Sequence, residues 1–259
     1  AREFYQEFFA LAAHSDTPAT DFDERATRFA GTFISWRGSF SQIEKLLGLL
    51  GQVTVAPDGQ GGLMIGERRF VEIGDRLFRD VENGDLVAFQ ENDQGDIIGY
   101  VQDGLSIISM YKAGGQTSQA FNFGLLGLAV IVFLAVLLRY LYQRDRLRAL
   151  QAADKSANRA AALAAVSHLW VLIFGAVVAV AVGDQFMARI PLLFKLWLIF
   201  PIIASLASFY LLYQTVLVWK NGLLAGNFGR IRYSIVSLCA LFMTWFYYYW
   251  NILGFNYFG

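Results

Sequence analysis

The first half of the chain alternates short apolar runs with turn residues, a pattern typical of antiparallel β structure. The runs are rich in β-branched and aromatic residues, and the turns between them contain Asn, Asp and Gly, which tolerate the positive φ of tight hairpins. The pattern predicts strands at 29–36, 52–56, 62–65, 69–73, 77–81, 86–90, 97–101 and 106–111. Short strands at this regular spacing predict a small barrel or sandwich.

A short helix is predicted inside this β region, at 41–50. Ser41 and Glu44 have the spacing of a capping box, in which the hydroxyl and the carboxylate each satisfy a free backbone amide at the helix start. The helix then carries one apolar face, made of Ile43, Leu46, Leu47 and Leu50. We expect this face to plug one end of the barrel, and we expect Arg37 and Glu44 to form a structural ion pair.

The second half of the chain consists mostly of long apolar stretches. The stretch 121–142 has no charge before Arg139, and its 22 residues reach about 33 Å, enough for a hydrocarbon core of roughly 30 Å. The third of the four stretches, at about 192–219, contains Pro201, which is expected to kink it. These later stretches predict further spans at about 160–182, 192–219 and 231–253.

We therefore expect an α+β membrane protein, with a small antiparallel β-barrel or sandwich followed by a four-helix transmembrane bundle. Its parts are an N-terminal connector at 1–28, a β-barrel-like module at 29–115 and the four spans within 121–254. Composition agrees, because 56% hydrophobic residues are too many for a soluble domain and 16% charged residues are too many for spans alone.

Charge sets the expected topology. The 21 basic and 21 acidic residues cancel, so no global field points to nucleic acid as a partner. Basic residues gather after the first and third spans, at 143–159 and at Lys220, Arg230 and Arg232. Because such loops stay cytoplasmic, the β module and both termini are expected on the periplasmic or extracellular side of a bacterial inner membrane.

Candidate chemistry in the chain is weak. Ser-x-x-Lys occurs at 109–112 and Tyr-x-Asn at 249–251, as in serine β-lactamases. We interpret both as chance, because the first falls in a predicted strand and the second at the end of a predicted span. His14 and His168 are the only histidines, too few for a metal site or a triad, and His168 is interpreted as an interfacial or helix-packing residue.

Two further sets of polar residues are better explained by structural roles than by functional ones. Asn92, Asp93 and Asp96 lack the spacing of a calcium loop and predict a hairpin turn instead. Lys195 is expected to extend to the membrane interface, although an intramembrane functional lysine is the alternative. The sequence therefore predicts no catalytic residue, no cofactor site and no metal site in this chain.

The order of several short motifs resembles the region that follows the catalytic domain in bacterial membrane-bound serine hydrolases related to class C β-lactamases and penicillin-binding proteins. The motifs are FAGTF at 29–33, Arg37, EKLL at 44–47, DG at 58–59, DQG at 93–95 and WNILGF at 250–255. Phe33 stands where that family usually has Tyr. The resemblance implies a lipocalin-like β module followed by transmembrane helices.

The resemblance leads to our first functional hypothesis. The chain would be the noncatalytic C-terminal membrane anchor of a serine β-lactamase-like hydrolase. It would hold at the membrane a periplasmic catalytic domain that is missing from this chain. Since the chain begins at Ala1 without Met or a signal sequence, we expect a segment upstream of it. The alternative is an accessory or scaffold subunit of a larger membrane complex. The expected partners are the lipid bilayer and either the catalytic domain or partner membrane subunits.

Overall fold

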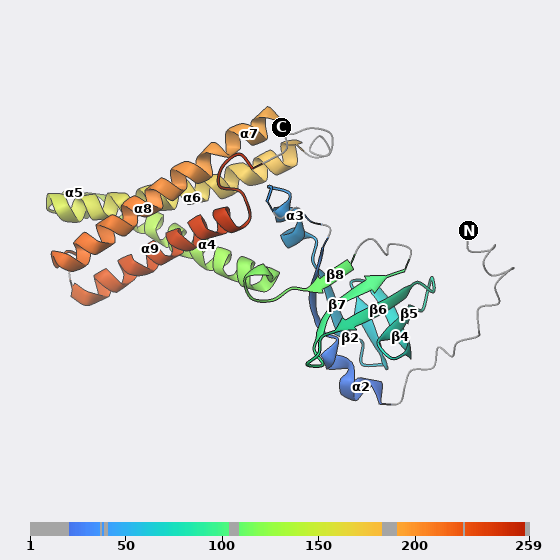
Figure 1. Ribbon diagram of the computed structural model, residues 1–259. Helices are drawn as coiled ribbons and strands as arrows, with labels where there is room; N and C mark the ends of the chain where they lie inside the picture. Colours follow the sequence, from blue (N-terminus) through green and yellow to red (C-terminus); the bar gives the residue numbers. More distant parts are fainter. Residues whose placement is uncertain are drawn as a thin grey trace. The chain divides into compact units, whose positions relative to one another are not determined.

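The computed structural model describes residues 21–36, 38, 41–103, 109–182, 191–224 and 226–256. It divides the chain into two compact units (Figure 1). The barrel unit consists of Ala1–Gly38 and Leu47–Ser118, and the helical unit consists of Ser39–Leu46 and Gln119–Gly259. A short segment between the first two strands thus belongs to the helical unit.

Eight antiparallel strands of the described residues close into a barrel, in which sequence neighbours pair and β1 also pairs with β8. The strands are β1 (Gly31–Ser35), β2 (Val53–Pro57), β3 (Gly62–Ile65), β4 (Arg68–Gly74), β5 (Leu77–Asp80), β6 (Leu86–Glu91), β7 (Ile97–Gln102) and β8 (Ser109–Lys112). All lie at the predicted positions to within a few residues, because alternating burial is visible in the sequence. Of the two predicted architectures, the barrel is confirmed.

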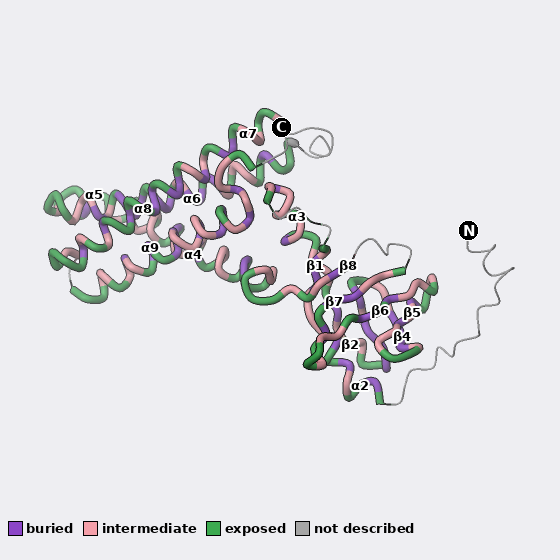
Figure 2. The backbone as a smooth tube through the Cα atoms, in the orientation of Figure 1, coloured by how far each residue is buried: buried purple, intermediate pink, exposed green. Residues whose placement is uncertain are grey.

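Aromatic rings fill the barrel. Phe89 lies 5.0 Å from Phe29, 5.3 Å from Phe78 and 5.4 Å from Tyr100 between ring centroids, and most of these contacts are edge-to-face. The helix α2 (Phe22–Arg25) and the 3₁₀ turn η1 (Ala26–Arg28) add Phe22, which is fully buried in the same core. Figure 2 shows buried segments along the strands and α2. Helix α2, which we call the entry helix, is therefore part of the barrel core.

The predicted plug helix is wrong in its start and in its buried face. Helix α3 (Lys45–Leu50) begins after Ser41 and Glu44, so these two residues do not form a capping box. Leu47 and Leu50 are 53% and 59% exposed, although we expected them to plug the barrel. The buried residues are instead Ile43, before the helix, and Leu49. The reason is that the segment up to Leu46 packs with the helical unit. Arg37, the predicted partner of Glu44, lies outside the described residues.

The helical unit is built from antiparallel helices that pack side by side (Figure 1). The 3₁₀ turn η2 (Gly115–Thr117) leads into them. Helix α4 packs against α6 and α9, and α8 packs against α6 and α9. The helices are α4 (Gln119–Tyr142), α5 (Arg144–Arg148), α6 (Ala152–Val182), α7 (Leu192–Trp197), α8 (Ile199–Lys220) and α9 (Gly226–Tyr249).

Three helices of the described residues, not four, are long and apolar enough to cross a membrane. They are Gln119–Tyr142, Ala152–Ala181 and Leu192–Lys220. The fourth predicted span is wrong, because α9 carries Arg230 and Arg232 in its first two turns and many Ser and Tyr residues after them. The aromatic residues of α9 are typical of a membrane span, but each tyrosine adds a polar hydroxyl group that makes the helix less apolar.

The predicted kink at Pro201 is a short break in the third span. Helix α7 ends at Trp197 and α8 begins at Ile199, with Leu198 between them. Proline has no N–H to offer the carbonyl of residue 197, and its ring crowds that carbonyl, so the regular ladder is interrupted there. Pro201 itself is buried in the first turn of α8, where proline is tolerated.

We expect Phe89→Ala to lower the free energy of unfolding of the barrel by about 3–5 kcal/mol, because the ring that joins the aromatic core is lost. Ile98→Ala is the matched control, since Ile98 lies on the neighbouring strand β7 and is 46% exposed. Its expected effect is about 0.5 kcal/mol or less. Hydrogen exchange of the strand amides measures both variants, and equal losses would contradict an aromatic core.

Candidate functional site

The two sequence matches to serine hydrolase motifs lie in unsuitable structure. Residues Ser109–Lys112 form β8, which pairs with β1 and β7, so the predicted strand is confirmed. In a strand, Ser109 and Lys112 point to opposite faces, whereas a nucleophile and its base must meet. The second match, at 249–251, ends α9 and forms the turn described next.

The end of α9 is a turn that begins a junction within the helical unit. Asn251 has φ +56°, the left-handed conformation that Asn tolerates. Its N–H donates to the carbonyl of Tyr248 at 3.1 Å, and the N–H of Ile252 donates to that of Tyr247 at 2.7 Å. This is the Schellman pattern, which satisfies the last carbonyls of a helix. The sequence contains the signal for it, an Asn just after the last apolar turn.

The segment between β1 and β2 completes this junction. Lys45 Nζ donates to the carbonyl of Tyr249 at 2.7 Å and lies 3.9 Å from the centroid of the Tyr249 ring. The N–H of Ile43 donates to the carbonyl of Asn256 at 2.8 Å, and Asn251 Nδ2 donates to the carbonyl of Gln42 at 3.0 Å. Burial lowers the pKa of Lys45 by removing water from its ammonium group. The carbonyl and the aromatic face replace part of that water.

Trp250 fixes the junction to the first long helix. Its indole N–H donates to Oδ1 of Asn122 at 3.0 Å, and both residues are almost fully buried. Asn122 lies in the first turn of α4, so the end of α9 lies beside the start of α4. We call the contacts among residues 42–45, Asn122 and 249–256 the junction. It joins the EKLL and WNILGF segments, two of the motifs named in the sequence analysis.

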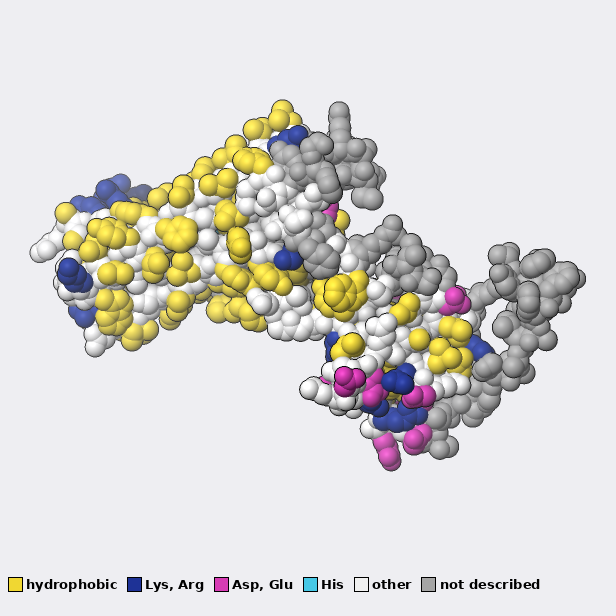
Figure 3. Space-filling model, in the orientation of Figure 1, with side chains coloured by type: hydrophobic (Ala, Val, Ile, Leu, Met, Phe, Trp, Pro, Cys, Tyr) yellow, Lys and Arg dark blue, Asp and Glu magenta, His cyan; other side chains and the backbone are white. Residues whose placement is uncertain are grey.

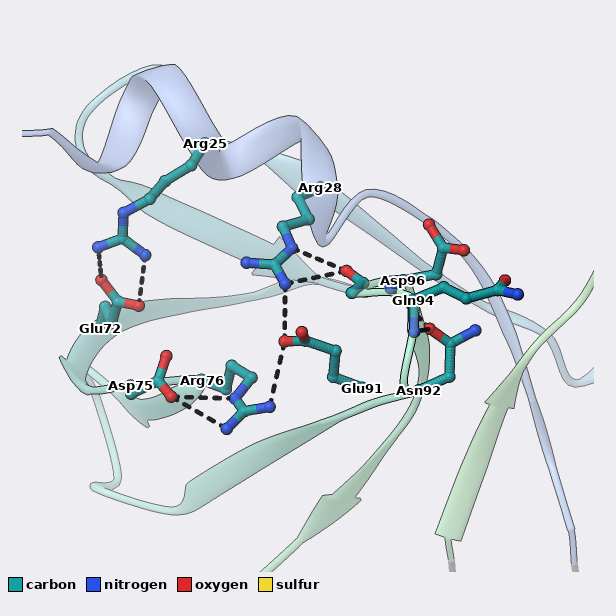
Figure 4. A network of polar contacts seen from close by, with 10 residues as sticks. Arg25, Arg28, Glu72, Asp75, Arg76, Glu91, Asn92, Gln94 and Asp96 are labelled. Atoms are coloured by element: carbon teal, nitrogen blue, oxygen red, sulfur yellow. Dashed lines mark hydrogen bonds and ion pairs between the residues drawn. The ribbon is translucent and has the colours of Figure 1, made fainter.

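Arginine side chains hold the entry helix on the barrel (Figure 4). Arg25 makes a two-fold hydrogen bond to Glu72, with Nη1 2.8 Å from Oε1, and this bond raises the pKa of Arg25 above its ordinary value. Arg28 pairs with Glu91 at 2.6 Å and donates from Nη2 to the carbonyl of Gly95 at 2.9 Å. Glu91 also pairs with Arg76 at 3.1 Å. The segment before β1 is therefore fixed to strands β4 and β6.

The candidate calcium loop is a hairpin turn, as predicted. Oδ1 of Asn92 accepts hydrogen bonds from the N–H groups of Gln94 at 3.0 Å and Asp96 at 2.9 Å. This bonding is the Asx turn typical of a tight connection between strands. Figure 4 shows the turn beside Arg28, whose partner Gly95 lies at its tip.

A second acidic turn carries a partly buried ion pair. Burial of Asp58 disfavours its charge, but the hydrogen bond from Arg69 Nε at 2.6 Å and those from the N–H groups of Gln60 and Gly62 outweigh burial. Together they lower the pKa of Asp58 below its ordinary 3.8. The carboxylate therefore fixes the β2–β3 turn in its charged form.

A buried polar cluster joins the helices of the helical unit. Nδ1 of His168 lies 3.1 Å from the hydroxyl of Tyr247, and Nε2 lies 2.8 Å from Oγ of Ser208. The imidazole stacks on Phe133 with ring centroids 5.2 Å apart and planes 8° apart. The four residues come from α6, α9, α8 and α4, and each is at most 1% exposed.

The carbonyl groups around Ser208 determine the direction of these hydrogen bonds. Oγ of Ser208 lies 3.0 Å from the carbonyl of Ala204 and 3.2 Å from that of Ala240, and a carbonyl can only accept. The Ser208 proton is therefore used there, so Nε2–H of His168 donates to Ser208. Nδ1 then accepts from Tyr247, and every polar atom of the imidazole has a partner. A fully satisfied cluster of this kind cross-links helices, which agrees with the helix-packing interpretation of His168.

The partners of His168 were not predicted from the sequence. Ser208 is 40 residues from His168 and Tyr247 is 79 residues away, so no local motif links them. The only available signal was a histidine inside an apolar stretch, because such a group must find partners within the bundle. Lys195, the other intramembrane candidate, is half-buried in α7.

Comparison of the chain with protein-family models, with curated proteins and with solved structures finds no match. Within the described residues, no group of three or more His, Cys, Asp or Glu side chains has a geometry that can hold a metal ion. The junction, the entry helix and the buried cluster therefore have to be interpreted from their own geometry.

We expect acid to destabilise the barrel through Asp58. Because its pKa is depressed in the folded state, its contribution is fully present above 3.8 and is lost as the pH falls from there through the folded pKa. In Asp58→Asn the side-chain oxygen still accepts the turn hydrogen bonds, but the side chain has no charge to lose. The free energy of unfolding of this variant should therefore fall less over this pH range. Asp75→Asn, whose carboxylate is 79% exposed, is the control. Urea unfolding at a series of pH values gives the slopes, and equal slopes for wild type and Asp58→Asn contradict the assignment.

A double-mutant cycle tests the cluster. His168→Phe keeps a ring for Phe133 but removes the acceptor of the Tyr247 hydroxyl and the donor to Ser208, and we expect a loss of about 1–2 kcal/mol in the free energy of unfolding. When His168→Phe is combined with Tyr247→Phe, the coupling energy between the two substitutions should be about 0.5–1.5 kcal/mol. Tyr248→Phe, on a neighbouring residue that is 71% exposed, should show no coupling. Equilibrium unfolding in mixed micelles measures these energies, and equal coupling for both tyrosines would disprove the cluster.

Proposed function

We propose that this chain is the noncatalytic membrane-anchoring portion of a serine β-lactamase-like hydrolase. In this proposal the barrel positions a catalytic domain, carried upstream of it, at the membrane surface. The observation that carries the proposal is the junction. The EKLL segment and the turn that carries WNILGF, which resemble that family and lie about 200 residues apart, meet where Lys45 bonds the carbonyl of Tyr249.

The junction gives these segments a reason to occur together. Lys45 needs the carbonyl at the end of α9, and Asn251 supplies both the helix-ending turn and a donor for Gln42. The matching supports a helical unit in which both resembling segments belong to one packed structure.

The interior of the barrel favours a supporting role over ligand transport. A lipocalin-type carrier encloses a cavity for its ligand. Here Phe22, Phe29, Phe33, Phe78 and Phe89 occupy the barrel core, and all are at most 5% exposed. The entry helix is held by Arg25 and Arg28. A domain attached before this helix would thus be connected to a rigid support.

The charge pattern supports one membrane orientation. Arg144, Arg146, Arg148, Lys155 and Arg159 follow the first candidate span, and basic loops of this kind favour the cytoplasmic side. We therefore place the barrel on the opposite face, which is the periplasm in a bacterium. The bond between Trp250 and Asn122 places the end of α9 beside the start of α4.

The alternative proposal is an accessory subunit of a larger membrane complex. Large apolar side chains are exposed along the candidate spans, among them Ile131 and Leu138 at 66% and 67%. Such side chains can contact lipid or the helices of a partner. Attachment of a catalytic domain distinguishes the two proposals.

The deciding measurement is the intact mass of the polypeptide from its native membrane, with peptide mapping and a fluorophosphonate serine-hydrolase probe on the same band. The anchor proposal predicts a species well above 29.0 kDa that contains Ala1 internally and reacts with the probe. A species near 29.0 kDa that begins at Ala1 and does not react would contradict it and favour the accessory subunit.

A further inference from the structure

Three depressions meet on one part of the helical unit. A basic pocket of about 170 Å³ is lined by Tyr140 and by four cations, Arg144, Arg148, Lys155 and Arg159. An apolar groove of about 450 Å³ runs between α4 and α6 past Leu137, Leu163 and Val166. A cavity of about 360 Å³ lies between α4, α6 and α9. Tyr140 lines all three, and Arg159 lines both the basic pocket and the groove.

The four cations of the basic pocket outnumber the carboxylates of the same helices. In α4 to α6 the acidic residues are Asp145 and Asp154. Asp145 is 83% exposed and lies 3.7 Å from Arg148 and 4.0 Å from Arg144, while Asp154 accepts a hydrogen bond from the N–H of Leu224. Among the described residues, the side chains of Lys155 and Arg159 have no hydrogen bond or ion pair. Figure 3 shows Lys and Arg side chains gathered at the end of the helical unit where α5 lies.

The cavity beside the basic pocket also has positively charged side chains in its wall. Arg139 and Arg232 line it, from α4 and α9, together with apolar residues such as Val136 and Val236. Two arginines at the wall of an apolar cavity repel each other unless an anion lies between or beside them. The whole region therefore combines positive charge with surfaces that suit hydrocarbon.

A ligand for this region must be anionic at one end and apolar over most of its length. Lipid-exposed hydrocarbon gains little by moving from lipid into an apolar groove, so the groove orients an acyl chain and the cations provide the selectivity. Basic pockets between membrane helices on the cytoplasmic side suit acidic lipid headgroups for this reason. A soluble anion would use the basic pocket and leave the groove beside it without a role.

We propose that the basic pocket and the adjoining groove bind a phospholipid with an anionic headgroup from the leaflet on the basic side of the membrane. The phosphate lies against Lys155 and Arg159, and an acyl chain follows the groove past Leu163 and Val166. This proposal requires that the long helices cross a membrane, but it does not depend on the attached hydrolase. The two tests can therefore fail separately.

Native mass spectrometry of the full chain in mixed micelles tests the proposal, with phosphatidylglycerol and phosphatidylcholine as competing lipids. We expect the wild type to retain phosphatidylglycerol preferentially. The double variant Lys155→Gln/Arg159→Gln should lower its affinity roughly 25-fold, about fivefold for each cation. The charge-preserving variant Lys155→Arg/Arg159→Lys should stay close to wild type.

Lys220→Gln is the matched control, because Lys220 is an exposed cation at the end of α8 and does not line the pocket. It should retain phosphatidylglycerol as the wild type does. Equal retention of both lipids by the wild type overturns the proposal, and so does an equal loss in the control, which would indicate diffuse surface charge. The proposal is also overturned if inorganic phosphate displaces the bound lipid as effectively as added phosphatidylglycerol does, since the ligand would then be a soluble anion.

Discussion

Helices that lie in hydrocarbon gain little from burying apolar side chains against one another, so close packing and directional polar contacts must hold them together. In the helical unit this condition is met at His168. The imidazole donates to Ser208, accepts from Tyr247 and stacks on Phe133, so a single side chain fixes α4, α6, α8 and α9. The pockets on the basic end, which are lined by α4, α5, α6 and α9, depend on that arrangement.

The barrel, in contrast, is stabilised by removing apolar side chains from water. Its core rings are removed from water, and burial of apolar area is the dominant favourable contribution to such folding. The ion pairs of Glu91 with Arg28 and Arg76 are partly exposed and contribute little individually, whereas Arg25 pairs with the buried carboxylate of Glu72. Their role is geometric, because they determine where the entry helix lies. Burial of apolar rings in the barrel and buried polar contacts between the helices thus stabilise different halves of one chain.

The sequence allowed good prediction wherever the physical cause was local. Strand positions followed from alternating polarity, the Asn92 turn from its side-chain chemistry, and the break before Pro201 from the missing N–H. Errors arose where the partner was distant. The 41–50 segment has an amphipathic pattern, but the pattern cannot say which unit the apolar face meets. The aromatic residues of α9 imitated a membrane span, although its arginines and hydroxyl groups lower its apolarity.

The candidate site shows the same division. The Schellman turn at Asn251 has a local signal, whereas the bond from Trp250 to Asn122 spans 128 residues and has none. His168 could be recognised as unusual, but its partners could be identified only after the helices were assembled. The basic residues of 143–159 were used to predict topology, yet their arrangement around a pocket depends on the packing of α5 against α4 and α6.

The junction also determines the order in which the molecule can be completed. Lys45 and Tyr249 are 204 residues apart, so Lys45 leaves the ribosome long before its partner has been synthesised. Non-local contacts of this kind form late, because the entropy of closing the loop must be paid first. The segment between β1 and β2 thus remains unpartnered until the last helix has been inserted or docked. Closure of the junction therefore follows the synthesis of α9 and joins residues 42–45 to the end of that helix.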